Sequence, residues 1–256
     1  MPVTRIAAEE VFRKALTVHP INVRLTTFEN KDEFERKLGF EIPAPAFFTS
    51  QSIYLILNII NKRDMLVFLV LHELGHQIWD PGDVFIGVTL DLITQKKLLS
   101  ENKSIASSFG QIQNVYSDAV INSIIMADDK LNGTFGSSFV DTVKDIYAIG
   151  CPWNVYVGNL ARDPVEAFKK GLINACMGLQ WLKQFDRPKY DAALVKINHS
   201  NDSDLRNFVA TIQKLIDEQK LAQKDTQRYY DVCVPLEMTM NNMLNRGYGS
   251  GGVTHL

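Results

Sequence analysis

The sequence of 256 residues predicts an α+β fold that is mostly helical. Runs that favour β-strands lie within the first 60 residues, whereas apolar residues at helical spacing recur through the rest of the chain. A wholly apolar run at residues 65–71 directly follows the β-rich part and is typical of a buried helix. We therefore expect a small N-terminal sheet that packs on this helix, followed by a helical half.

Composition and charge narrow the class of protein. The chain is 46% hydrophobic and 22% charged, as ordinary globular proteins are, and its net charge of −2 gives no electrostatic case for binding nucleic acid or an anionic membrane. Its three cysteines (Cys151, Cys176 and Cys233) are widely spaced and form no C-x-x-C pair, which predicts free thiols in a reducing compartment.

Neither a signal peptide nor a membrane span is expected. The N-terminus lacks an apolar h-region, and four polar residues at 61–64 interrupt the one long apolar region, Ile53–Leu71. These observations favour a cytoplasmic protein.

The N-terminal elements follow from local patterns. Asn30 can cap a short helix that Gly39 ends, and Ser50–Ser52 separates two β-rich runs that could form a hairpin. The expected elements in order are a helix at 4–17, a strand at 21–25, a helix at 30–39, and strands at 46–49 and 53–57.

Residues 64–83 contain the motif H-E-x-x-H, formed by His72, Glu73 and His76. A helix has about 3.6 residues per turn, so the two histidines share a face and can close on one tetrahedral metal ion. Glu73 then projects toward the open side of the metal, where a carboxylate can take a proton from metal-bound water that attacks a carbonyl. In having a sheet beside a metal-bearing helix, this part of the chain resembles the start of the zincin metallopeptidases, and the resemblance implies a zincin-like fold.

The rest of the chain is predicted to be helical. We expect breaks around Asn132–Gly133 and Gly136, and we expect Pro235 to kink or end the last helix. Helices are predicted at 84–100, 111–129 and near 139–149, 164–183, 203–222 and 225–245. This gives a metal-binding domain at 1–130, a helical region at 131–245 that packs on it as one unit, and a glycine-rich, flexible tail at 246–256.

A catalytic zinc usually has three protein ligands and one water, so a third ligand is needed. Asp118 is the best candidate because Asn114, Asp118 and Asn122 recur every four residues as a polar stripe on an apolar helix. A cation facing Asp118 would satisfy a buried carboxylate, and the two asparagines would orient the ligands by hydrogen bonds. The alternative is that the stripe faces solvent.

Other residues have weaker support than Asp118 as the third metal ligand. His19, His199 and His255 lie in no ligand pattern, and Glu101 and Glu166 have no supporting motif. Asp80 and Asp83 stay open as ligands, although a metzincin-type motif would place its glycine and its ligand where Trp79 and Gly82 stand. For a hydrogen-bond donor to the oxyanion of a transition state, the candidates are Tyr116, Tyr147, Tyr156 and His199.

The H-E-x-x-H motif is followed about forty residues later by N-x-x-x-D-x-x-[IV]-N, which is formed by Asn114, Asp118, Ile121 and Asn122. In this combination the chain resembles a family of zincin-like metallopeptidase domains, whose members often carry a von Willebrand factor A-like domain after the peptidase-like part. The resemblance covers roughly residues 45–125 and implies a zincin-like fold and peptidase activity.

The sequence therefore favours a zinc-dependent metallohydrolase, most simply a metallopeptidase that acts on a peptide or protein substrate. Zn²⁺ would be bound by His72, His76 and Asp118, with Glu73 as general base. Two alternatives stay open: a non-catalytic, metal-stabilised binding or regulatory module whose helical half contacts a protein partner, and a metal-free helical interaction domain.

Overall fold

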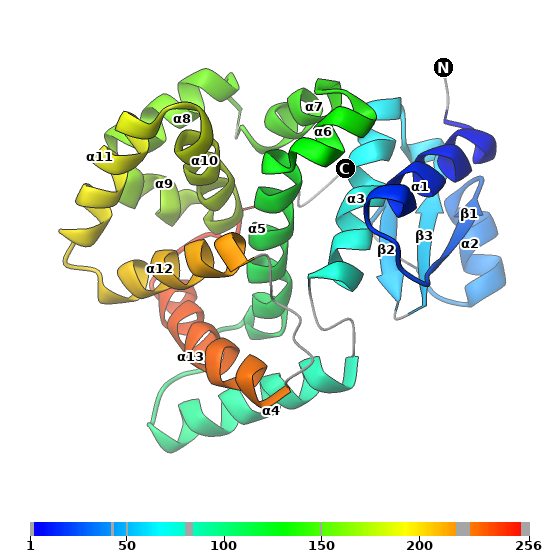
Figure 1. The fold of residues 1–256 in the computed structure, drawn as a ribbon. Coiled ribbons are helices and arrows are strands. Elements are labelled where there is room, and N and C mark those ends of the chain that lie inside the picture. The colour runs from blue at the N-terminus through cyan, green and yellow to red at the C-terminus, as the bar shows by residue number, and fades with distance from the viewer. Residues whose placement is uncertain are drawn as a thin grey trace. The chain divides into compact units, whose positions relative to one another are not determined.

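The computed structural model describes residues 3–41, 44–49, 51–79, 84–148, 150–218 and 226–251 (Figure 1). The chain divides into two compact units, and each of them combines segments that are separated in the sequence. In the described residues, the first unit comprises those up to Ile78 together with Asp128–Ile146, and the second comprises Trp79 to Ala127 together with residues 147–251. These units do not coincide with the regions 1–130 and 131–245 that we expected from the sequence.

The first unit contains a three-stranded sheet with the strand order β1-β3-β2. β1 (Arg24–Phe28) is parallel to β3 (Ser52–Ile56), and β2 (Ala46–Thr49) pairs with β3 in antiparallel fashion as the predicted hairpin. The strand predicted at 21–25 begins later, at Arg24.

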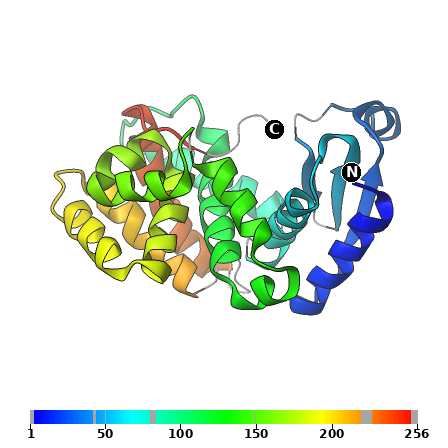
Figure 2. The same ribbon diagram turned by 90° about the horizontal axis from the view of Figure 1, so that it is seen from above.

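Helices cover both faces of this sheet. On one face, Phe34 of α2 (Lys31–Leu38) is fully buried against Phe28 and Ile56. Side chains alternate along a strand, so Ile53 and Leu55, both fully buried, point to the other face. The helices α1 (Arg5–Val18) and α3 (Arg63–Ile78) contact the strands and each other, and α1 lies beside the sheet in both views (Figures 1 and 2).

The caps predicted for α2 are confirmed. The side chain of Asn30 accepts a hydrogen bond from the backbone N–H of Glu33, and Gly39 ends the helix in the left-handed conformation. The 3₁₀ turn η1 (Leu57–Ile59) then leads from β3 toward α3.

The second segment of the first unit is helical. α6 (Asp129–Phe135) runs through Asn132–Gly133, so the break predicted at those two residues is wrong, and Gly136 ends the helix with a positive φ of 82°. The hydroxyl of Ser138, at the start of α7 (Ser138–Tyr147), donates a hydrogen bond to Asp64 in the first turn of α3.

The second unit is all helical in its described residues. Its central helix is α5 (Ile112–Ala127), which is buried along nearly its whole length and lies against α10 (Leu172–Phe185). The other elements are α4 (Val84–Ser100), η2 (Phe109–Gln111), α8 (Trp153–Arg162), α9 (Pro164–Lys170), α11 (Arg187–Asn198), α12 (Ser203–Glu218) and α13 (Thr226–Asn245).

Three details of the helical half differ from the sequence prediction. The helix expected at 164–183 is two helices, because Gly171 has an extended backbone that separates α9 from α10. α8 and α11 were not predicted. Of the two effects expected of Pro235, a kink or an end, the end is wrong, because α13 continues for ten residues beyond it to Asn245.

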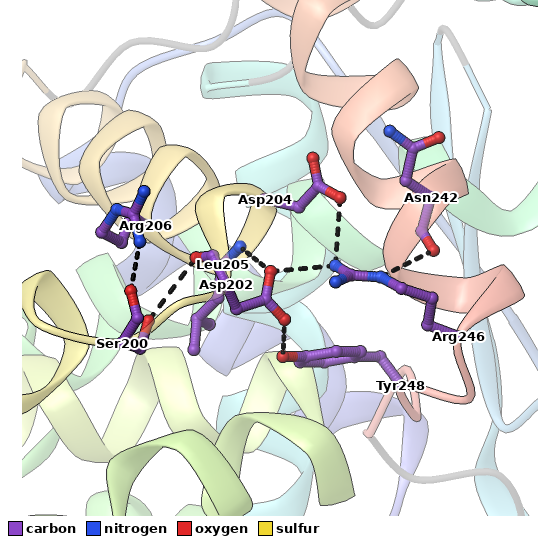
Figure 3. Close-up of polar contacts among 8 residues, drawn as sticks. All are labelled: Ser200, Asp202, Asp204, Leu205, Arg206, Asn242, Arg246 and Tyr248. Carbon is purple, nitrogen blue, oxygen red and sulfur yellow. Dashed lines mark hydrogen bonds and ion pairs between the residues drawn. The ribbon is translucent and has the colours of Figure 1, made fainter.

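The tail predicted to be flexible from residue 246 is packed as far as it is described, to residue 251. Its Tyr248 is only 5% exposed and donates a hydrogen bond to Asp202, which also accepts one from Arg246 (Figure 3). The backbone N–H of Gly249 donates to Lys169, and a Cβ at this glycine would lie 2.7 Å from a backbone oxygen of α9. The glycines thus permit close packing here.

Candidate metal centre

The helix α3 of the first unit presents both histidines of the motif on one side. Its residues from Leu66 to Leu71 are buried, whereas His72 and His76 are only half-buried. The two imidazole rings lie 5.0 Å apart between centroids and almost perpendicular to each other, and Phe68 packs at 5.7 Å from the ring of His72. The pair is therefore spaced for two nitrogen ligands on one ion.

Glu73 lies next to His72 on α3 and is almost completely buried, with 7% of its surface exposed. A carboxylate that is shielded from bulk water has stronger electrostatic interactions with a nearby proton donor than an exposed one. Its position adjoining the histidines suits a general base that works at the same ion.

The helix α5 of the second unit carries the predicted polar stripe, but the three side chains differ in burial. Asn114 is exposed, Asp118 is half-buried and Asn122 is fully buried. Exposure to solvent therefore decreases along the stripe, from Asn114 through Asp118 to Asn122. The roles predicted for Asn114 and Asn122 in orienting a ligand stay predictions, and of the two side chains only that of Asn122 is buried.

Asn122 contacts Tyr147, a candidate oxyanion donor on which the charge of Asp118 acts. Its side-chain N–H donates a hydrogen bond of 3.1 Å to the hydroxyl of Tyr147, which is 4% exposed. Burial raises the pKa of Tyr147, and the negative charge of Asp118 raises it further, while the hydrogen bond from Asn122 opposes the change. The Tyr147 hydroxyl thus keeps its proton and faces the charge of Asp118.

The backbone at Tyr147 is fixed as well. The side-chain N–H of Asn174, on α10, donates a hydrogen bond of 2.6 Å to the carbonyl oxygen of Tyr147, and Asn174 is itself buried. Asp118, Asn122 and Tyr147 consequently form one polar cluster in the interior of the second unit.

The other predicted donors lie elsewhere. The hydroxyl of Tyr116 pairs with that of Tyr229 at 3.2 Å, although Tyr116 is only two residues from Asp118. Tyr156 lies on α8, where burial raises its pKa and the nearby Cys176 and Cys151 raise it further. His199 is exposed, and its ring bonds to the backbone of α11.

The rival ligands divide into two groups. His19 faces Asp128 at 3.6 Å, and the exposed Glu101 and Glu166 face Lys103 and Lys170. Asp80, Asp83 and His255 lie outside the described residues.

Among the described residues, His72, His76 and Asp118 are the group of His, Cys, Asp and Glu side chains that could hold a metal ion. One ligand atom from each of them lies within 4.8 Å of the other two. The histidines belong to the first unit and Asp118 to the second, so the binding of one ion by all three is part of the function that we propose.

One polar group was missed by the sequence analysis. Glu237 of α13 is fully buried close to Asp91 and Thr94 of α4, far from any motif. The only signal in the sequence is a glutamate between Leu236 and Met238 on a helix whose neighbouring positions are apolar.

Comparisons with models of protein families, with curated proteins and with solved structures found no match. No described helix of the chain is long and apolar enough to cross a membrane. The function must therefore be argued from the site itself.

Proposed function

We propose that this protein is a zinc-dependent hydrolase, most simply a peptidase, in which His72, His76 and Asp118 hold the zinc ion and Glu73 is the general base. The single observation that carries the proposal is that the ligand atoms of these three side chains lie within 4.8 Å of one another. The resemblance of both motifs to zincin-like metallopeptidase domains supports the same reading.

The donor set suits zinc in a catalytic site. Two imidazole nitrogens and one carboxylate oxygen are typical of catalytic zinc, and three protein ligands leave a fourth position for water or substrate. All three side chains are half-buried, so they are partly desolvated and still within reach of solvent. A structural zinc site would instead take its fourth ligand from the protein.

When bound, Zn²⁺ acts as a Lewis acid that lowers the pKa of water and polarises a substrate carbonyl. The side chain of Glu73 accepts the proton of the attacking water and delivers it to the leaving amine, as the position of this residue beside His72 allows. The burial of Glu73 keeps its carboxylate from being fully hydrated, which strengthens its interaction with that proton.

In this proposal Tyr147 and Asn122 position Asp118. Asn122 donates to the oxygen of the Tyr147 hydroxyl, so the proton of that hydroxyl points elsewhere and can be given to an acceptor. The carboxylate of Asp118 is the negative group that acts on Tyr147. A hydrogen bond to a ligating carboxylate fixes its orientation, as in other metal sites.

The test compares two substitutions in the zinc-loaded full chain. We expect Glu73→Gln to keep one equivalent of zinc and to lose hydrolysis of a peptide library, and His72→Ala to lose both. Glu101→Gln, which removes an exposed carboxylate, serves as the control and should change neither. Zinc is measured by elemental analysis and hydrolysis by mass spectrometry of the peptides.

Full retention of zinc by His72→Ala would refute the proposed site. Zinc that is lost from His72→Ala, combined with no cleavage of any peptide by the unaltered protein, would favour the metal-stabilised binding module over the hydrolase.

A further inference from the structure

A second group of enclosed oxygen atoms lies within the second unit, where α4 contacts α13. Glu237 of α13 and Thr94 of α4 have no exposed surface. Asp91 lies one turn before Thr94 on α4 and is half-buried, with one of its carboxylate oxygens enclosed. The two α4 residues are three positions apart, so they share a face of the helix.

These oxygens have no hydrogen-bond partner in the described part of the chain. This holds for both carboxylate oxygens of Glu237, for the hydroxyl of Thr94 and for the enclosed oxygen of Asp91. The groups are nevertheless near one another, because both Thr94 and Asp91 affect the titration of Glu237. Three oxygen-bearing side chains therefore face one place, where Thr94 and Asp91 lie within hydrogen-bonding influence of Glu237 but leave these oxygens without a well-formed hydrogen bond.

The group also lacks a compensating positive charge. Burial raises the pKa of Glu237 to about 8, the charge of Asp91 adds to this effect, and Thr94 opposes it. No basic side chain is among the groups that shift the pKa of Glu237 or of Asp91. A buried carboxylate that has no well-formed hydrogen bond and no counter-charge is strongly unfavourable, so this arrangement needs a bound proton or cation.

We propose that Asp91, Thr94 and Glu237 form a binding site for a hard divalent cation of the Ca²⁺ or Mg²⁺ class, which joins α4 to α13. All donors are oxygens, the ligands that these cations prefer, and none is a nitrogen or sulfur atom of the kind that selects zinc. Two carboxylates balance the charge of one divalent ion. The partial exposure of Asp91 leaves a path from solvent and room for water ligands.

A proton shared by Asp91 and Glu237 is the alternative to a bound cation, and the role of Thr94 distinguishes these two possibilities. A proton held between Asp91 and Glu237 would not require the threonine hydroxyl, whereas a cation would use its oxygen as a ligand. The site shares no residue with His72, His76 or Asp118, so its test does not depend on the proposed hydrolase function.

The experiment uses the full chain, stripped of metal and then restored with one equivalent of zinc. CaCl₂ or MgCl₂ is titrated by calorimetry, and the midpoint of thermal unfolding is measured with and without each salt. We expect one equivalent of Ca²⁺ or Mg²⁺ to bind and the midpoint to rise by about 5–10 °C at roughly a hundred times the dissociation constant.

Three variants make the test specific. Glu237→Gln should abolish both responses, and Thr94→Val, which preserves the shape of the side chain, should weaken binding by about tenfold or more. Asp231→Asn removes an exposed carboxylate from the same helix as Glu237 and should leave binding unchanged.

Absence of any response to millimolar Ca²⁺ and Mg²⁺ in the unaltered protein would overturn the proposal. So would unchanged binding in Glu237→Gln or, if that variant fails to fold, in Thr94→Val. Stabilisation by falling pH without any response to the cations would overturn it in favour of the shared proton.

Discussion

Replacement of Tyr147 by phenylalanine tests the link between the fold of the second unit and the proposed metal site. The hydroxyl of Tyr147 accepts the hydrogen bond from Asn122 at 3.1 Å and faces the charge of Asp118. Both Tyr147 and Asn122 are buried. The substitution therefore removes the hydrogen bond from the side-chain N–H of Asn122 to the Tyr147 hydroxyl, while the aromatic ring continues to fill its space.

The expected size of the effect follows from this geometry. Removal of one partner from a buried hydrogen bond costs about 1–3 kcal/mol, because the remaining polar group stays desolvated. Loss of a group that orients a metal ligand typically weakens metal binding by about 10–100-fold. Tyr147→Phe should therefore lower the free energy of unfolding by about 1–3 kcal/mol and weaken zinc binding by about 10–100-fold.

The assays separate these two effects. Urea denaturation of the metal-free protein gives the free energy of unfolding without the contribution of bound zinc. Competition with a chromogenic chelator gives the zinc affinity. Tyr116→Phe is a matched control, because it removes a buried hydroxyl from the same helix as Asp118, where it pairs with Tyr229 at 3.2 Å. It should cost about 1 kcal/mol of stability and leave zinc affinity unchanged.

The reasoning is refuted if the two variants weaken zinc binding equally. It is also refuted if Tyr147→Phe is as stable as the unaltered protein, since the bond from Asn122 would then contribute nothing.

Two further predictions concern the two units separately. Tyr248→Phe should cost about 1.5–3 kcal/mol at pH 7, because the lost hydrogen bond of 2.6 Å is to the charged Asp202. Burial alone would raise the pKa of Asp202, but the hydrogen bonds from Tyr248 and Arg246 outweigh burial and hold that pKa below its ordinary value of 3.8. The ionised Asp202 therefore stabilises the folded protein above pH 3.8, and this contribution is lost as the pH falls through the folded-state pKa. Urea denaturation at pH 7 and near pH 2 should show the difference between variant and unaltered protein disappear in acid, and a difference that persists there would contradict the assignment. In the first unit, Phe34→Ala should lower the free energy of unfolding by about 3–5 kcal/mol, because Phe34 is fully buried among Phe28, Phe40 and Phe47. The control Phe40→Ala, at a ring that is 51% exposed, should lower it clearly less. Equal losses of stability in denaturant titrations would contradict the packing described for α2.

Features that depend on neighbouring residues could be predicted from the sequence. The caps of α2 at Asn30 and Gly39, the hairpin of β2 and β3, and the shared face of His72 and His76 each involve groups within one or two turns of chain. Capping, pairing across a short turn and the helical repeat act at that range, so local sequence suffices.

Features that depend on packing were decided only by the tertiary structure. The stripe Asn114, Asp118 and Asn122 is regular in sequence, yet its first residue is exposed and its last is fully buried. This difference arises from the packing of α5 against other helices of the second unit. No local signal distinguished Tyr147 from Tyr116, and their hydroxyls face different partners.

The same contrast holds where the sequence prediction was wrong or silent. The glycine-rich segment after residue 245 reads as a flexible tail, but Tyr248 finds a buried partner in Asp202, more than forty residues earlier in the chain. Glu237 reads as an ordinary helical glutamate until α4 brings Asp91 and Thr94 against it. Local sequence thus determined which side chains could bind a metal ion or transfer a proton. Packing against segments distant in the sequence decided which of these side chains are buried beside suitable partners.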